Sequence, residues 1–471
     1  MTDSARLLPT LAFGQPGPVR DFLVGEILAG RKTGSSNLRV LYELWQQSIP
    51  SAGERYALLD SQDERVAVIR FDRVSTITFP EATPEVAAQE SATLEQWQAV
   101  HRDFWAGFDD DIRAHLGDPS WAFGDSESIV TTAFTLEQRL ATGLGVIGAG
   151  FHASRNILPA VGLAGVPITA LATRDTVRSQ AALRRFGSEG AAYADADALL
   201  ADPAVRDVTV IAQPEDQATL TLRAIAAGKN VFADKPLGLN PEQAQQIADA
   251  AAAADVIVMV GFMKRHAPAY VRLRELLAEG ALGTPRSFEL SFGCDSTPFC
   301  ATEEEFVKLA AIHVVDLVRF LFGEVESAVT HSNSAGAHVA LSTTLRFASG
   351  VVGTLNLTGL PSYSSEFEML RVSGDAGHAV VTDVARLQLH VVAEGDVPTW
   401  QGLSETSTVF TPAESAMSGV ERDLFLRGFV GEIRAFRQAA AAHEQPSSSA
   451  ADNVRTMELC ERILGGLPNT F

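Results

Sequence analysis

Cysteine is scarce in this chain of 471 residues, and long apolar runs and positive charges are scarce as well. The three cysteines, Cys294, Cys300 and Cys460, form no C-x-x-C pair and argue against a disulfide framework, which indicates a reducing compartment. No stretch reaches the roughly 18 apolar residues that a membrane helix needs, and the first residues carry charges before only a short apolar patch. We therefore expect a soluble, cytoplasmic protein without membrane contact.

The deficit of positive charge restricts the classes of binding partner that we expect. Lys and Arg number 37 against 58 Asp and Glu, which gives a formal net charge of -21. Affinity for nucleic-acid phosphates comes from Lys and Arg, and the excess acid is spread over the chain and not held in a tail. We expect no extended nucleic-acid contact, although a single nucleoside could still bind.

Length and apolar content predict several domains. At 471 residues, 46% of them apolar, the chain exceeds what one hydrophobic core usually supports. Residues 10–136 show strand-like runs followed by a helix that begins with a capping box of Thr93 and Gln96. Residues 141–262 alternate short apolar runs with Ala-rich helical segments, which is typical of a doubly wound parallel sheet covered on both faces. Residues 263–471 contain longer, half-polar strands.

The helix after the capping box carries an apolar stripe at helical spacing. Its members are Leu94, Trp97, Val100, Phe104 and Phe108. We expect this stripe to face the core of the first domain.

Polarity alternates along the strands of the third block. In residues 286–292, apolar side chains alternate with polar ones, which predicts one buried face and one polar face available for association between copies of the chain. We expect a helix over about 307–322 and a last pair of helices after Glu421 to cover the buried face.

A glycine-rich turn follows the apolar run 144–147. It reads Gly148-Ala149-Gly150-Phe151-His152-Ala153, a G-x-G-x-x-A pattern that leads into a helix. The two glycines allow a tight turn and a close backbone approach, and the N–H groups of the helix N-terminus face a pyrophosphate. The expected dinucleotide contacts in this turn are Gly148, Gly150, Phe151, His152 and Ala153. A second turn, Asp234-Lys235-Pro236, ends the strand at 230–233 and falls at the same crevice, beyond the carboxyl ends of the strands.

Together these features resemble the Gfo/Idh/MocA oxidoreductases over about residues 141–465, including the segment 370–377, which looks like the family's late strand-turn-strand. The resemblance implies a multidomain α/β protein: a Rossmann domain followed by an α/β domain with an open, mostly antiparallel sheet. The implied reaction transfers hydride between a nicotinamide cofactor and a small hydroxyl or carbonyl substrate such as a sugar or polyol. The family's Glu-Lys-Pro motif supplies a catalytic lysine, which carries over to Lys235, with Asp234 in place of glutamate and Pro236 beside the cofactor. A partly desolvated lysine there can take the hydroxyl proton.

The family also presents Asp-x-x-x-His on the helix that enters the second domain. His313 matches the histidine and is the expected substrate-orienting partner, but Leu309 stands where the acid is usual. A dinucleotide-binding sensor without turnover is therefore an alternative function. Asp316 is interpreted as a packing or hydrogen-bonding residue and not as a catalyst, and His313 and Asp316 lack further ligands for a metal site.

Cofactor preference depends on the end of the second strand of the nucleotide-binding domain. NAD sites usually place an acid there, whereas this chain has Thr173 and Arg174, which favours NADP over NAD because Arg174 could face a 2′-phosphate. The alternative is a solvated Arg174, with Asp175 as the cap of the next helix. Gln213 and Pro214 are expected to shape the cofactor pocket. By resemblance, Lys264 and Arg265 are expected either to contact the substrate or to form a solvated charge pair.

Residues 19–136 resemble an ASCH domain, a small β-barrel related to PUA domains. Amidohydrolase-type members use a lysine, a hydroxyl three residues later and a glutamate before the helix, and the matching residues are Lys32, Ser35 and Glu90. The lysine would take the hydroxyl proton, the hydroxyl would attack an amide, and the carboxylate would serve the leaving amine. The resemblance leaves open nucleoside recognition, hydrolysis of a modified nucleoside, and a structural accessory role.

Overall fold

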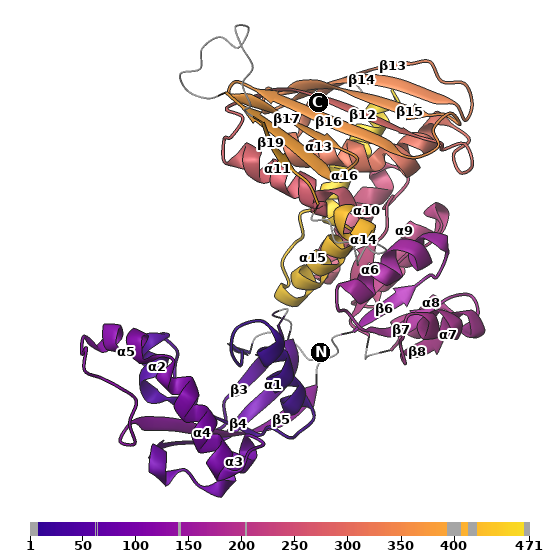
Figure 1. Ribbon diagram of the computed structural model, residues 1–471. Helices are drawn as coiled ribbons and strands as arrows, with labels where there is room; N and C mark the ends of the chain where they lie inside the picture. The colour runs from indigo at the N-terminus through magenta and orange to yellow at the C-terminus, as the bar shows by residue number, and fades with distance from the viewer. Residues whose placement is uncertain are drawn as a thin grey trace. The chain divides into compact units, whose positions relative to one another are not determined.

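The computed structural model describes residues 8–61, 63, 65–139, 143–202, 205–392, 407–412 and 422–465. The chain divides into two compact units, Met1–Thr142 and Gly143–Phe471 (Figure 1). No helix in the described ranges is long and apolar enough to cross a bilayer.

The N-terminal unit contains a five-stranded sheet in the order β1-β3-β4-β5-β2. Its strands are β1 (Thr10–Leu11), β2 (Gly34–Leu38), β3 (Arg55–Leu59), β4 (Arg65–Thr78) and β5 (Ser128–Arg139). Its helices are α1 (Pro18–Leu28), α2 (Arg39–Leu44), α3 (Pro84–Gln89), α4 (Leu94–Ala106) and α5 (Asp109–Leu116). The capping box at the start of α4 is present as predicted, with Thr93 and Gln96 bonding each other's backbone N–H.

The apolar stripe on α4 is only partly in the core. Trp97 is 1% exposed, but Val100 is 63% and Phe104 52% exposed, so the prediction is wrong for these two residues. Trp105, which the stripe did not include, is fully buried. The buried face of α4 is therefore narrower and rotated, because two large indoles fill the space below the helix.

The second unit begins with a six-stranded sheet in the order β11-β10-β9-β6-β7-β8, and every pairing in it is parallel. The strands are β6 (Leu144–Ile147), β7 (Ile168–Ala172), β8 (Ala191–Tyr193), β9 (Asp207–Val210), β10 (Asn230–Ala233) and β11 (Val258–Val260). The helices are η3, a π-helix (Ala153–Ile157), α6 (Leu158–Leu163), α7 (Thr176–Arg185), α8 (Ala196–Leu200), α9 (Pro214–Ala226) and α10 (Pro241–Ala254). This order confirms the predicted doubly wound fold.

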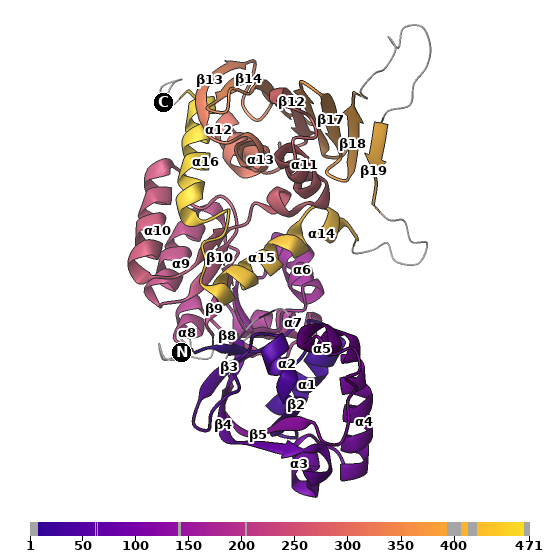
Figure 2. The same ribbon diagram turned by 90° about the vertical axis from the view of Figure 1, so that its left-hand side faces the viewer.

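An eight-stranded sheet follows in the order β13-β14-β15-β12-β16-β17-β18-β19, and it is antiparallel except where β12 pairs with β15. Its strands are β12 (Pro285–Cys294), β13 (Val325–Ser332), β14 (Val339–Phe347), β15 (Val352–Gly359), β16 (Phe367–Gly374), β17 (Gly377–Thr382), β18 (Arg386–Val391) and β19 (Ser407–Phe410). One face packs on helices, as predicted (Figure 2). The segments on that side are η4 (Met263–His266), α11 (Pro268–Ala278), α12 (Glu303–Glu305), η5, a π-helix (Phe306–Ala311), and α13 (Ile312–Phe322).

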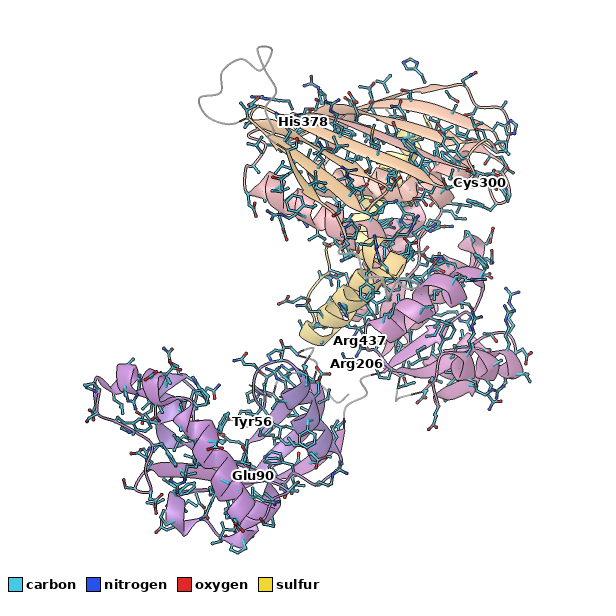
Figure 3. All side chains as sticks on the ribbon, viewed as in Figure 1. Tyr56, Glu90, Arg206, Cys300, His378 and Arg437 are labelled. Atoms are coloured by element: carbon cyan, nitrogen blue, oxygen red, sulfur yellow. The ribbon has the colours of Figure 1, made fainter. Side chains whose placement is uncertain are left out.

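The last helices are α14 (Arg422–Leu426), α15 (Phe429–Ala442) and α16 (Ala450–Ile463). We expected the final pair to cover the C-terminal sheet, but α15 packs on the nucleotide-binding sheet, where Phe436 lies 5.9 Å from Phe232 of β10. A buried ion pair between Arg437 and Asp207 of β9 fixes α15 there; Figure 3 labels Arg437. Helix α16 packs along α10 and α13. The chain thus returns to the nucleotide-binding sheet, and residues 143–471 form one unit.

Candidate active site

The glycine turn follows β6 and leads into η3. Gly148 has φ +104°, and a Cβ at this position would lie 2.0 Å from the carbonyl oxygen of Ile211. Only glycine fits so close to the end of the neighbouring strand. The turn at Gly148, here called the glycine cradle, therefore passes close to the end of β9, as the expected dinucleotide turn requires, and Phe151 beside it is 81% exposed.

His152 of the glycine turn lies beside Asp234. The amide of Asn156 donates to His152 Nδ1 at 2.9 Å, which leaves the proton on Nε2, 3.5 Å from Asp234 Oδ2. The other carboxylate oxygen, Asp234 Oδ1, accepts the N–H of Lys235 at 2.9 Å. Two turns far apart in the sequence are thus joined at the carboxyl ends of β6 and β10.

Lys235 is half-buried, and its Nζ donates to the main-chain carbonyl oxygen of Leu309 at 2.7 Å. The Lys235-Pro236 peptide bond is cis. Leu309 lies in η5, one turn before His313, so this contact brings the lysine to the helix that carries His313. The structure therefore joins the predicted lysine to the predicted histidine-bearing helix, without a carboxylate at residue 309.

His313 lies at the start of α13, and the edge of its imidazole meets Phe262 with ring centroids 6.4 Å apart. Burial lowers the pKa of His313 well below its usual value, and the nearby cations Lys235 and Lys264 act in the same direction. The imidazole is therefore neutral. Its Nδ1 is buried and has no hydrogen-bond partner within the described part of the chain.

The Lys264 ammonium forms hydrogen bonds with two carboxylates. Its Nζ lies 2.5 Å from Glu368 Oε2 and 3.3 Å from Glu366 Oε1, and Tyr270 donates its hydroxyl to Glu368 at 2.5 Å. Glu366 in turn accepts from Arg427 at 3.0 Å. Glu366 is the more accessible acid, with 29% of its side chain exposed against 1% for Glu368. A substrate would meet Glu366 more readily than Lys264.

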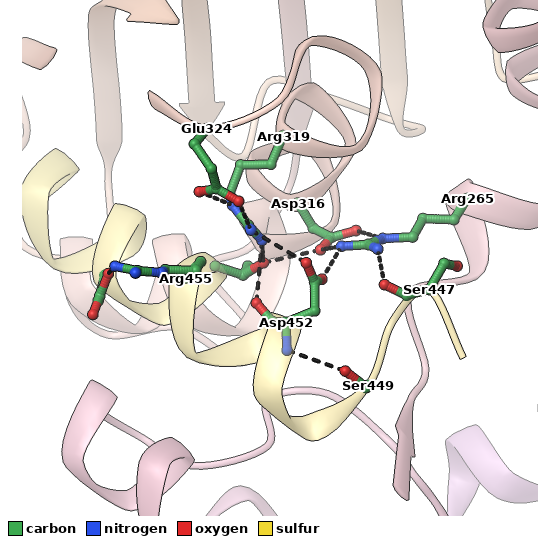
Figure 4. Close-up of polar contacts among 10 residues, drawn as sticks. Arg265, Asp316, Arg319, Glu324, Ser447, Ser449, Asp452 and Arg455 are labelled. Atoms are coloured by element: carbon green, nitrogen blue, oxygen red, sulfur yellow. Dashed lines mark hydrogen bonds and ion pairs between the residues drawn. The ribbon is translucent and has the colours of Figure 1, made fainter. Parts of the chain in front are cut away.

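Arg265 has a structural position, contrary to the expectation of a substrate contact or a solvated charge. Its guanidinium binds both carboxylate oxygens of Asp316, at 2.7 and 2.5 Å, one oxygen of Asp452 at 2.5 Å, and the Ser447 carbonyl at 2.6 Å (Figure 4). Only 3% of the side chain is exposed. The sequence could not reveal this role, because Asp452 lies 187 residues further along the chain.

The end of β7 carries the residues expected to choose the cofactor. Thr173 uses its hydroxyl within the loop, donating to the Asp175 carbonyl at 2.7 Å, and Asp175 caps α7 through the N–H of Val177. Arg174 is solvated: 91% of its side chain is exposed, and one contact of 3.2 Å joins it to Asp216. The one acid of this loop, Asp175, is used as the cap of α7.

Gln213 and Pro214 form the start of α9, with Pro214 at its first position. The side chain that organises this corner is instead Gln217, which is buried. It accepts from Ala212 N at 2.8 Å and donates to the carbonyls of Val210 and Asp234 at 2.8 and 3.1 Å. Gln217 therefore ties the end of β9 to the end of β10, just before Lys235.

Glu432 is a site residue that sequence reasoning missed. It lies on α15, one turn after Phe429, whose ring packs 5.9 Å from His152. The residue is 1% exposed, and its Oε2 has no partner among the described residues. Burial raises the pKa of this carboxyl well above its usual value, and Asp234 nearby adds to the shift. No sequence signal pointed to it, because α15 was expected elsewhere.

The N-terminal unit holds a separate polar cluster. Lys32 Nζ lies 2.7 Å from Glu90 Oε2, and Trp97 donates its indole N–H to Glu90 Oε1 at 2.8 Å. His101 stacks on Trp97 with ring centroids 4.3 Å apart, and burial lowers its pKa. Ser35 lies on β2, and no hydrogen bond joins its hydroxyl to Lys32 or Glu90 in the described structure. Two of the three predicted residues are thus brought together.

His101 is directed towards Glu90. Its Nδ1 donates to the Trp97 carbonyl oxygen at 2.9 Å, and its Nε2 lies 3.7 Å from Glu90 Oε1, a pair that attracts only when the imidazole carries a second proton. Across the ranges that the structure describes, no group of three or more His, Cys, Asp or Glu side chains could hold a metal ion.

A parallel sheet with a glycine cradle, a lysine at a strand end and a histidine-bearing helix from a second, open sheet define a dinucleotide-dependent oxidoreductase. Comparison with family models agrees. Residues 142–262 match the oxidoreductase family with an NAD-binding Rossmann fold, residues 270–380 match the GFO/IDH/MocA C-terminal domain, and residues 10–138 match the ASCH domain. The chain belongs to the Gfo/Idh/MocA oxidoreductases and carries an N-terminal ASCH domain, which confirms the resemblance found in the sequence.

Curated relatives share moderate identity. D-apiose dehydrogenase of Paraburkholderia graminis is 28% identical over 350 residues, which is 72% of this chain and 90% of the relative. An inositol 2-dehydrogenase of Acidothermus cellulolyticus is 31% identical over 227 residues, which is 46% of this chain and 65% of that protein.

Solved structures share the fold. Levoglucosan dehydrogenase in complex with NADH and levoglucosan superposes with a TM-score of 0.59 at 20% identity, covering 69% of this chain and 96% of that one. An Agrobacterium radiobacter oxidoreductase in complex with NAD+, L-tartaric acid and magnesium gives a TM-score of 0.60 at 20% identity, with the same coverage.

Proposed function

We propose that the second unit oxidises a secondary alcohol of a small sugar or polyol with a nicotinamide dinucleotide, and reduces the matching carbonyl in reverse. The observation that carries the proposal is the placement of Lys235 Nζ against the helix of His313, at the strand end beside the glycine cradle. The names of the relatives, which act on apiose and inositol, support this substrate class.

Each residue of the site has a separate role in the proposed reaction. The Gly148 cradle fits a pyrophosphate, and a bound nicotinamide supplies the hydride acceptor. As the C–H electron pair of the carbinol leaves as hydride, the O–H bond breaks and Lys235 takes the proton, so that a carbonyl forms. His313 is neutral and can share a hydrogen bond with the substrate oxygen without adding a charge. Asp234, held by the main chain of Lys235 and by His152, fixes the turn.

We propose that NADP(H) is accepted in preference to NAD(H). The hydroxyl of Thr173 cannot repel a 2′-phosphate as an acid would, and Arg174 stands exposed beside it. The family model and the similar solved structures, which contain NAD+ or NADH, favour NAD instead. The two cofactors must therefore be compared directly.

Measurement of turnover tests the proposed oxidoreductase function. The purified protein is incubated with NAD+ or NADP+ and a panel of sugars and polyols that includes D-apiose, inositols and levoglucosan, and nicotinamide reduction is followed by absorbance. We expect reduction with at least one of them. Tight cofactor binding without turnover on the whole panel would contradict the proposal and favour a dinucleotide sensor.

We propose that copies of the chain associate through the outer face of the C-terminal sheet. This face carries Val329, Val352 and Phe367, which are 46%, 39% and 43% exposed. Exposed apolar side chains on an otherwise polar sheet favour an interface. Light scattering on Val352→Glu/Phe367→Glu should show a smaller assembly than the unmodified protein, and an unchanged mass would exclude this face.

For the ASCH domain we propose binding of a small nucleoside, supported by the buried Lys32–Glu90 pair that Trp97 holds in place. A charge pair with side chains only 7% and 9% exposed is costly to bury, which favours a role beyond packing. Hydrolysis of an acylated nucleoside is the second possibility. Release of acetate from N-acetylated cytidine, lost in Lys32→Ala, would support hydrolysis; retention of that release in Ser35→Ala would exclude Ser35 as nucleophile.

A further inference from the structure

We infer that the main-chain carbonyl of Leu309 positions Lys235, in place of the carboxylate that the family resemblance led us to expect at this point of the helix. The inference rests on the proposed function and deepens it. It concerns a positioning group, because the carbonyl acts on the substrate only through the lysine.

The contact is short and arises from an irregular helix. Lys235 Nζ lies 2.7 Å from the Leu309 oxygen, and residues 306–311 form a π-helix between α12 and α13. A π-helix inserts one residue into the usual winding, which displaces its carbonyls relative to an α-helix, and such segments occur often at functional sites. A carbonyl oxygen has two lone pairs, so it can accept from the lysine as well as from the helix.

The side chain of Leu309 has a different role. It is partly buried and packs against the apolar core of the second unit. The residue therefore contributes its backbone to the site and its side chain to the core, so a leucine at this position is compatible with turnover.

A carbonyl acceptor differs from a carboxylate in one respect that matters for proton transfer. It carries no net charge and cannot take up a proton under ordinary conditions. An amine form of Lys235 can keep one N–H on the Leu309 oxygen while its lone pair faces the substrate hydroxyl. After the proton arrives, the ammonium keeps the same hydrogen bond. The lysine is thus held in both states of the reaction.

The test weakens this one carbonyl without changing any side chain. Replacing Ala310 by its α-hydroxy analogue, lactic acid, turns the Leu309–Ala310 peptide into an ester, whose carbonyl is a poorer acceptor. Because the weaker acceptor holds the lysine less firmly in both states, we expect kcat to fall by roughly tenfold or more while the KM for the cofactor stays within about threefold. The matched control places the same ester one residue later, at Ala311, and should leave kcat within about threefold.

One side-chain variant completes the test. Leu309→Asp should not raise kcat, because the backbone already supplies the acceptor. Equal kcat in the Ala310 and Ala311 esters, or a rise of about tenfold or more in Leu309→Asp, would overturn the inference.

One readout is independent of turnover. Trace acetylation followed by peptide mass spectrometry reports how freely Lys235 reacts, and the Ala310 ester should change the labelling of Lys235 and not that of Lys264. If the unmodified protein shows no turnover but the ester still changes this labelling, the proposed function fails and the contact stands. Unchanged labelling would contradict the contact itself.

Discussion

In the proposed reaction Lys235 takes the substrate proton; in the structure its amine donates to the neutral Leu309 carbonyl and its main-chain N–H donates to Asp234. We predict that Lys235→Ala lowers kcat by about 10²- to 10⁴-fold, the usual contribution of a general acid or base. The cofactor dissociation constant, measured by fluorescence titration, should change only a few-fold, because the lysine serves the transition state. Loss of cofactor binding without a separate rate defect would contradict this role.

The proposed preference for NADP depends on Arg174. We predict that Arg174→Ala raises the KM for NADP+ by about tenfold and leaves the KM for NAD+ unchanged, since a guanidinium contributes a charge-assisted bond only to the 2′-phosphate. Arg178→Ala, an exposed arginine on the following helix, is the matched control. Equal effects of Arg174→Ala on both cofactors would show that Arg174 does not read the phosphate.

The buried carboxyl of Glu432 should make the stability of the protein depend on pH. Its folded-state pKa lies above the unfolded value of about 4.3, so its favourable contribution is complete below that pH and is lost as the pH rises towards the folded-state pKa. Glu432→Gln removes the charge that folding must otherwise neutralise. We expect the Tm difference between Glu432→Gln and the unmodified protein to be more positive at alkaline than at acid pH. Glu444→Gln, an exposed control, should show no such trend.

At the scale of elements, the cluster around Arg265 joins η4, α13 and α16 and so holds the histidine-bearing helix in place. Removing one partner of a buried ion pair leaves an uncompensated charge. We predict that Asp316→Ala lowers the free energy of unfolding by about 3 kcal/mol or more. Asp375→Ala breaks an ion pair with Arg286 in which the Arg286 side chain is 65% and the Asp375 side chain 50% exposed. This change should lower the free energy of unfolding by less than about 1 kcal/mol. Urea unfolding measures both.

The strands and helices that could be predicted from the sequence are those marked by short, local patterns. The apolar runs around 146, 170, 209 and 232 predicted buried parallel strands because a strand covered on both faces needs apolar side chains throughout. The capping box of α4 was equally local. The packing of α15 on the nucleotide-binding sheet depends on Arg437 meeting Asp207, 230 residues away in sequence, and no local pattern reports such a contact.

The same limit applies to the site. Lys235 and Gly148 could be predicted because a strand end and a glycine turn are local signals with a chemical reason. The Leu309 carbonyl could not, because every residue has one and only the winding of the helix makes this one available. Arg265 was misassigned for a related reason: the residues that neutralise it lie on two other helices.

At the scale of the whole molecule, the chain combines two units, each with its own cores and its own polar cluster. We predict that residues 143–471 expressed alone retain kcat and cofactor affinity within about threefold, because the Lys235 site draws all of its described residues from this unit. Steady-state kinetics on the fragment and the full chain make the comparison. A fragment that folds, as judged by circular dichroism, but has lost turnover would assign a catalytic contribution to the ASCH domain.

Transfer of hydrogen from substrate carbon to cofactor is the central claim, and isotope labelling measures it directly. A sugar or polyol deuterated at the carbinol carbon is incubated with the protein and oxidised cofactor, and the reduced cofactor is analysed by mass spectrometry. We predict a reduced cofactor that carries the deuterium in the unmodified protein and almost none with Lys235→Ala, although both bind the oxidised cofactor. Bound cofactor that gains no deuterium from any member of the panel would contradict hydride transfer as the function of this site.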